Sequence, residues 1–174
     1  MKKTLKIIGG VFGAFFLLVL ILLIIDISND DTQIKDEPQT PEERIINEIN
    51  EKLGERTNED KKRVVKVEFG EFSKVTLNGD ETFSNKDLKL NMLSDTADVF
   101  QIIFKNEEVN KVMVGIQTTF VDEYGKEYDQ DGVRVVLNRE TYDKIVWENF
   151  NVENYENVAE SLYIHPAVSE AANN

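Results

Sequence analysis

The sequence contains no cysteine, and histidine and tryptophan occur once each in 174 residues. Without cysteine there is no disulfide, no thiol nucleophile and no residue that a bacterial lipoprotein would acylate. The single histidine, His165, leaves two-histidine zinc sites and Ser-His-Asp triads unavailable or incomplete. Glycine-rich phosphate-binding loops are also absent. We therefore expect a protein that is not an enzyme and holds no cofactor, apart from the calcium considered below.

Basic residues are scarce, because 20 lysines and arginines stand against 33 aspartates and glutamates. Lys2, Lys3 and Lys6 lie at the N-terminus, which leaves 17 basic and 33 acidic residues after position 6, a net charge of −16. Such a chain is repelled by phosphates and by anionic lipid headgroups, so no nucleic-acid partner is expected. The only later basic run, residues 61–63, is expected to be a solvated entry to a strand.

Residues 7–25 form an uninterrupted run of 19 uncharged and mostly apolar residues. As a helix this run is about 28 Å long, close to the roughly 30 Å of a bilayer core. It is longer than the apolar part of a cleaved signal peptide, and no A-x-A site follows it. The lysines before the run and the acidic residues after it predict a cytoplasmic N-terminus, residues 1–6, under the positive-inside rule. We expect a single-pass anchor in the cell membrane, with the rest of the chain outside the cell.

Gly9 and Gly13 form a G-x-x-x-G pair within this anchor, and Gly10 with Ala14 forms a second pair of small residues. Small residues let two membrane helices approach closely, so the pattern allows a homodimer through the anchor. The alternative is that these small residues are incidental, since glycine is common in membrane helices.

The chain after the anchor divides into an acidic linker (residues 26–39), a domain (residues 40–166) and a disordered polar tail (residues 167–174). Thr40, Pro41 and Glu43 have the spacing of a capping box and predict a helix over residues 41–53. The absence of cysteine, with abundant Asn, Ile, Lys and Glu, is typical of an AT-rich Gram-positive bacterium.

Alternating and helical apolar patterns predict the rest of the domain. Strands are predicted where apolar residues alternate, at residues 65–69, 74–77, 112–120 and 133–137. Helices are predicted after Ser84, after Asn138 and after Asn151, the last with Leu162 facing inward. In the first strand, Val65 is expected to point inward. This order predicts an α+β fold with a mainly antiparallel sheet packed by helices.

Five carboxylates lie within residues 122–131, on a predicted hairpin loop. Asp129 and Asp131, followed by Gly132, resemble part of a calcium-binding loop, and calcium takes six to eight oxygen ligands. The bidentate acid that such a loop needs after its glycine is missing. A calcium site at Asp129 and Asp131 and a solvated hairpin tip therefore both stay open.

Trp147, Phe150 and Tyr155 form an aromatic group interleaved with asparagine and glutamate. Aromatic residues with polar neighbours are favoured at protein interfaces, which makes these three a candidate partner surface. The alternative is that they close the core between the last helices.

The functional class that fits these expectations best is a membrane-anchored extracytoplasmic interaction module that binds a protein partner in the cell envelope. A single membrane anchor with a cytoplasmic N-terminus, followed by a small α+β domain, also occurs among accessory subunits of secretion and conjugation machines. This is an analogy of architecture alone. The alternatives are a calcium- or ligand-binding envelope sensor and a wall-acting hydrolase that uses a pair of carboxylates.

Overall fold

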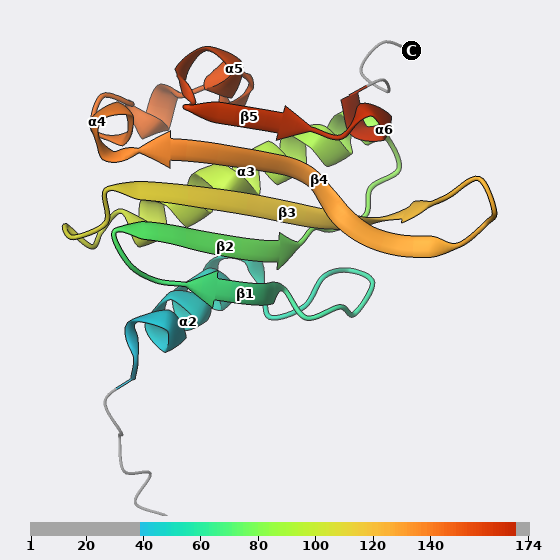
Figure 1. The fold of residues 1–174 in the computed structure, drawn as a ribbon, viewed down its shortest axis with the longest axis horizontal. Coiled ribbons are helices and arrows are strands. Elements are labelled where there is room, and N and C mark those ends of the chain that lie inside the picture. Colours follow the sequence, from blue (N-terminus) through green and yellow to red (C-terminus); the bar gives the residue numbers. More distant parts are fainter. Residues whose placement is uncertain (1–38, 170–174) are drawn as a thin grey trace, which may run out of the picture. The chain divides into compact units, whose positions relative to one another are not determined.

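A computed structural model describes residues 39–169 of the chain (Figure 1). They form a small α+β domain with one five-stranded sheet. The elements in chain order are α2 (Pro41–Leu53), β1 (Val64–Glu68), β2 (Phe72–Asn78), α3 (Asn85–Ile103), β3 (Lys111–Val121), β4 (Glu127–Asn138), α4 (Arg139–Tyr142), η1 (Trp147–Asn149), η2 (Val152–Asn154), α5 (Tyr155–Val158), β5 (Ser161–Ile164) and α6 (Pro166–Ser169).

Helix α2 begins at a complete capping box. The Thr40 side chain accepts a hydrogen bond from the backbone N–H of Glu43, and the Glu43 carboxylate accepts one from the backbone N–H of Thr40. Pro41 takes the first helical position, where no backbone donor is needed. Ser84 caps α3 and accepts a hydrogen bond from the backbone N–H of Asp87. Both predicted helix starts are confirmed.

Replacing Thr40 by alanine removes one of the two bonds of this capping box. We expect the free energy of unfolding to fall by about 1 kcal/mol, the usual cost of losing an N-cap. Urea denaturation of the isolated domain, expressed as residues 30–174, measures this change. Gln39→Ala is the control, because Gln39 is exposed and makes no part of the cap. Equal effects of the two substitutions would contradict the role of the cap.

The sheet is mixed, with the strand order β1-β2-β3-β4-β5. Three neighbouring pairs are antiparallel, whereas β2 and β3 are parallel. The parallel pair follows from α3, because this 19-residue helix connects β2 to β3 in the chain. It returns the chain to the end of the sheet where β2 began, so β3 runs in the same direction as β2. The mainly antiparallel sheet expected from the sequence did not include this crossover.

The hydrophobic core lies between one face of the sheet and helices α2 and α3. Met92, Phe100 and Ile103 of α3 are at most 1% exposed, and Ile45 and Ile49 come from α2. Alternate residues of the strands complete the core, and eight of them are fully buried: Val75, Leu77, Val112, Val114, Ile116, Val133, Val135 and Leu137. This face of the sheet is therefore buried, as the alternating pattern predicted.

Two details of the strand predictions are wrong. Val65 was expected to point inward, but Val64 is buried and Val65 is 50% exposed, because an irregularity at this point shifts the register between β1 and β2. Leu162 was expected in a helix, but Ser161–Ile164 forms the edge strand β5, which pairs with β4. In both places the pairing with a neighbouring strand decides the conformation.

Strands β3 and β4 continue past their neighbours as a two-stranded hairpin, seen at the right of Figure 1. The pairing of β2 ends opposite Gln117 and that of β5 ends opposite Val133, so no further described strand flanks the hairpin. Gly125, with a φ of 79°, makes its turn. Asp129 and Asp131 consequently lie in a strand and not in the hairpin loop predicted from the sequence.

The C-terminal end of the described chain packs onto the domain. Helix α6 contacts α3, and Val168 within it is only 1% exposed. The tail predicted for residues 167–174 therefore begins inside a helix, and the ordered domain extends to Ser169.

Several predictions concern residues outside the described part. These are the cytoplasmic segment 1–6, the anchor 7–25 with Gly9 and Gly13, and nearly all of the linker 26–39. Among residues 39–169, no helix is both long enough and apolar enough to cross a membrane.

Candidate interaction surface

The face of the sheet opposite α2 and α3 is covered by no helix of residues 39–169. Figure 1 looks onto this face, with α2 and α3 behind the sheet. The short helices α4 and α5 lie beyond β4, near the edge strand β5. We call this surface the open face. It is formed by the strand residues that alternate with the buried ones.

Strand register arranges the open face into three rows that run across the sheet. The first row holds Phe72, Lys111 and Asn138. The second row holds Glu68, Lys74, Met113, Val136 and Ser161. The third row holds Lys66, Thr76, Gly115, Arg134 and Tyr163. Met113 and Val136 therefore lie at the centre, with charged and aromatic side chains around them.

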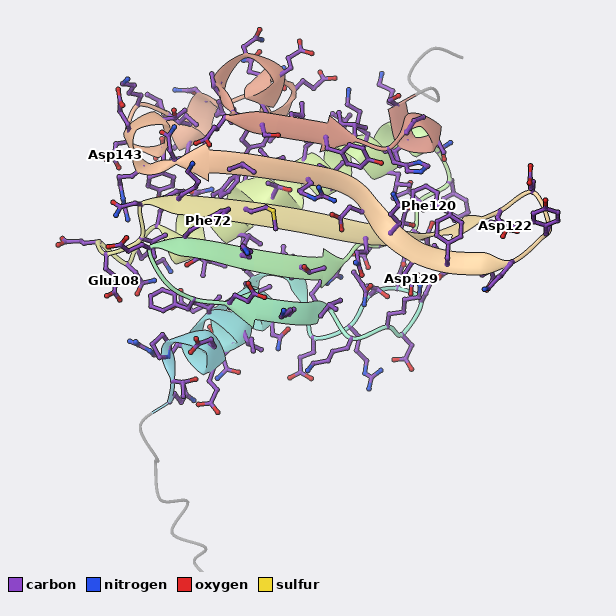
Figure 2. The ribbon with its side chains drawn as sticks, in the orientation of Figure 1. Phe72, Glu108, Phe120, Asp122, Asp129 and Asp143 are labelled. Atoms are coloured by element: carbon purple, nitrogen blue, oxygen red, sulfur yellow. The ribbon has the colours of Figure 1, made fainter. Side chains whose placement is uncertain are left out.

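The aromatic residues of the open face contact cations. The Lys74 and Lys111 Nζ atoms lie 5.4 and 5.9 Å from the ring centre of Phe72, which is 45% exposed. The guanidinium carbon of Arg134 lies 5.4 Å from the ring centre of Tyr163. Figure 2 shows Phe72 near the end of the sheet away from the hairpin. Methionine, arginine and aromatic residues are the types enriched at protein interfaces, and the open face combines them.

The three aromatic residues predicted as a partner surface lie in one chain of rings. The ring centre of Phe150 is 5.6 Å from that of Trp147 and 5.0 Å from that of Tyr155. Tyr155 is fully buried, burial raises the pKa of its hydroxyl, and this hydroxyl has no hydrogen-bond partner among the described residues. Trp147 is half-buried, and its indole nitrogen is likewise without a partner in the described part. A partner surface at these residues stays a prediction.

Phe150 also lines a surface hollow of about 560 Å³. Apolar and uncharged polar residues make most of its wall, together with one lysine: Thr141, Lys144, Ile145, Val146, Asn149, Asn154, Asn157 and Val158. None of these described lining residues carries a carboxylate. Such a wall suits an apolar side chain.

The two aspartates predicted to bind calcium contact different cations. The Asp129 carboxylate accepts hydrogen bonds from Lys61 Nζ at 2.9 Å and Thr119 Oγ1 at 2.8 Å, and these hold its pKa below the usual value. The Asp131 carboxylate accepts a hydrogen bond from Arg134 Nε at 2.7 Å. Among residues 39–169, no group of three or more acidic or histidine side chains is placed to hold a metal ion. Calcium binding stays a prediction. A calcium ion there would have to displace Lys61 from Asp129 and Arg134 from Asp131.

The basic run 61–63 is not a uniformly solvated entry to a strand, because Arg63 is only 3% exposed. Its guanidinium donates two hydrogen bonds to the Asp80 carboxylate, at 3.0 and 2.8 Å. It donates two more to backbone carbonyl oxygens, those of Asn78 at 3.1 Å and Arg56 at 3.3 Å. Arg63 thereby joins the loop before β1 to the loop after β2. The ion pair with Asp80, seventeen residues away, could not be read from the run itself.

Asp95 on α3 is a second ionisable residue near this cluster. Burial raises the pKa of its carboxyl to about 6, the positive charge of Arg63 opposes that rise, and the negative charges of Asp80 and Asp98 add to it. The folded-state pKa thus lies above the ordinary value of 3.8. The folded domain binds this proton more tightly than the unfolded chain does, so stability falls as the pH rises from 3.8 through about 6.

Asp95→Asn removes this penalty at neutral pH. We expect the free energy of unfolding of the isolated domain to rise by about 1–3 kcal/mol at about pH 7.5, and to change little near pH 4. Urea denaturation at the two pH values measures the difference. Asp143→Asn is the control, because Asp143 is 59% exposed and should show no such pH dependence. A stabilisation equal at both pH values would contradict the titration of Asp95.

Comparison of the chain with protein-family models, curated proteins and solved structures finds no match.

Proposed function

We propose that this chain is a membrane-anchored interaction module whose α+β domain lies outside the cell and binds a protein partner in the cell envelope. A partner within a transport or mobile-element system fits this architecture. In this proposal residues 7–25 hold the chain in the bilayer, residues 26–39 act as a spacer, and the domain provides the binding surface. No catalytic step is assigned to it.

The open face is the observation that carries this proposal. A two-layer domain buries one face of its sheet, and here the other face carries no helix of residues 39–169. Here that face has an apolar centre, Met113 and Val136, with Phe72 and Tyr163 beside it. An apolar centre with a polar rim is the usual anatomy of a protein interface.

Site-specific photo-crosslinking in the native membrane tests the proposal. A photoreactive amino acid at Met113 of the full chain should give one heterologous crosslinked product, identified by mass spectrometry as an envelope protein. The same amino acid at Asn91, which is exposed on α3, is the control and should give no such product. Crosslinks from Met113 only to a second copy of this chain, or to nothing, would contradict the proposal.

A further inference from the structure

Three lysines form a diagonal stripe across the open face. Lys66 pairs with Thr76, and Lys74 lies two residues before Thr76 on the same strand. Lys111 pairs with Phe72, which lies two residues before Lys74. Adjacent strands are about 4.8 Å apart and alternate residues about 6.7 Å apart, so consecutive lysines of the stripe are about 8 Å apart.

The charge of this stripe contrasts with that of the domain. Residues 39–169 contain 16 basic and 27 acidic side chains. The three rows of the open face contain four basic side chains and one carboxylate, that of Glu68. A second carboxylate, that of Asp131, lies against Gly115 of the third row and pairs with Arg134. The lysine stripe, with three basic side chains and the two carboxylates of Glu68 and Glu160, is therefore a positive strip on a strongly negative domain, and its complement is negative.

The carboxylates near the stripe do not neutralise it. The Glu68 carboxylate contacts two lysines, Lys66 and Lys74, and its distance to Lys74 Nζ is 3.5 Å. These two contacts hold the pKa of Glu68 below the usual value. Lys111 contacts Glu160 at 2.6 Å. The three lysine side chains are still 64%, 43% and 37% exposed, in chain order. Exposed ion pairs contribute little free energy and exchange readily for others.

We propose that the open face binds an acidic segment of a partner protein, whose carboxylates contact the lysine stripe and whose apolar side chains cover Met113 and Val136. This inference rests on the proposed function and adds the chemistry of the partner. The apolar centre favours a protein over a phosphate-rich polymer, because such a polymer has no apolar group to bury there. The net negative charge of the domain would also repel a long polyanion.

The test uses the full chain in lipid nanodiscs and a short fluorescein-labelled peptide in which glutamate alternates with leucine. We expect the triple substitution Lys66→Gln, Lys74→Gln and Lys111→Gln to weaken peptide binding about tenfold, as the loss of three exposed ion pairs implies. Glu68→Gln should strengthen binding about threefold, because it removes a competing carboxylate. Added salt should weaken binding to the unsubstituted chain.

A second triple substitution is the matched control. Lys62→Gln, Lys86→Gln and Lys126→Gln change the net charge equally, and these three lysines are exposed outside the open face. Equal weakening by both triples, no binding of the peptide to the unsubstituted chain, or tighter binding of inorganic polyphosphate than of the peptide would each overturn the inference. If the Met113 crosslink also fails to form, the proposed function falls with it; if that crosslink forms, only the acidic chemistry is wrong.

Discussion

Replacing Arg63 by alanine is expected to lower the free energy of unfolding of the isolated domain by about 3 kcal/mol. Removing one partner of a buried ion pair typically costs about 3–5 kcal/mol, and the lower end applies because Asp80 is 38% exposed. The four hydrogen bonds of the guanidinium also disappear. The link between the loop before β1 and the loop after β2 is lost with them. Urea denaturation measures the change.

Lys62→Ala is the matched control for this prediction. Lys62 is the neighbour of Arg63 in the same basic run, but its side chain is exposed. We expect its replacement to change the free energy of unfolding by less than about 0.5 kcal/mol. If the two substitutions cost the same, Arg63 does not hold the two loops together.

Met113→Glu is expected to weaken the affinity for the partner captured by crosslinking by about thirtyfold or more. Losing a central interface residue costs about 2 kcal/mol or more, and the new carboxylate would also repel an acidic partner. The stability of the isolated domain should change by less than about 1 kcal/mol, because Met113 is only partly buried and lies outside the core. The yield of the crosslink from a photoreactive amino acid placed at Val136 measures binding.

Asn91→Glu is the control for this substitution. It adds the same charge at an exposed position of α3, on the helical side of the sheet. It should leave the crosslink yield unchanged. A loss of the crosslink with both variants would indicate a general effect of charge, and the open face would no longer explain binding.

Local chemistry made the helix starts predictable from the sequence. The capping residues Thr40 and Ser84 act on backbone groups three residues away, so their effect is fixed by neighbours in the chain. The inward residues of the long strands were predictable for a similar reason, because alternation alone decides which side of a strand is apolar.

Features that depend on residues far apart in the chain were not predictable. Leu162 lies four residues after Val158, which is helical spacing, but pairing with β4 makes Ser161–Ile164 a strand. Arg63 looked like part of a solvated basic run because Asp80 is seventeen residues away. In each case a tertiary contact overrides the local pattern.

The candidate surface itself could be foreseen only in part. The sequence shows Lys66, Lys74 and Lys111 as polar residues that alternate with apolar ones, which predicts that each points away from the core. It does not show that they form one diagonal, because that depends on the register of β1, β2 and β3. Nor does it show which face the helices leave open.

Methionine methyl groups provide the most direct test of the claim that the open face is the binding surface. The chain has three methionines, of which Met113 lies on the open face and Met92 is buried at 1% exposure. In a methyl NMR spectrum of the full chain with ¹³C-labelled methionine, adding the partner identified by crosslinking should shift or broaden the Met113 signal and leave the Met92 signal unchanged. A complex that forms without any change in the Met113 signal would contradict the account.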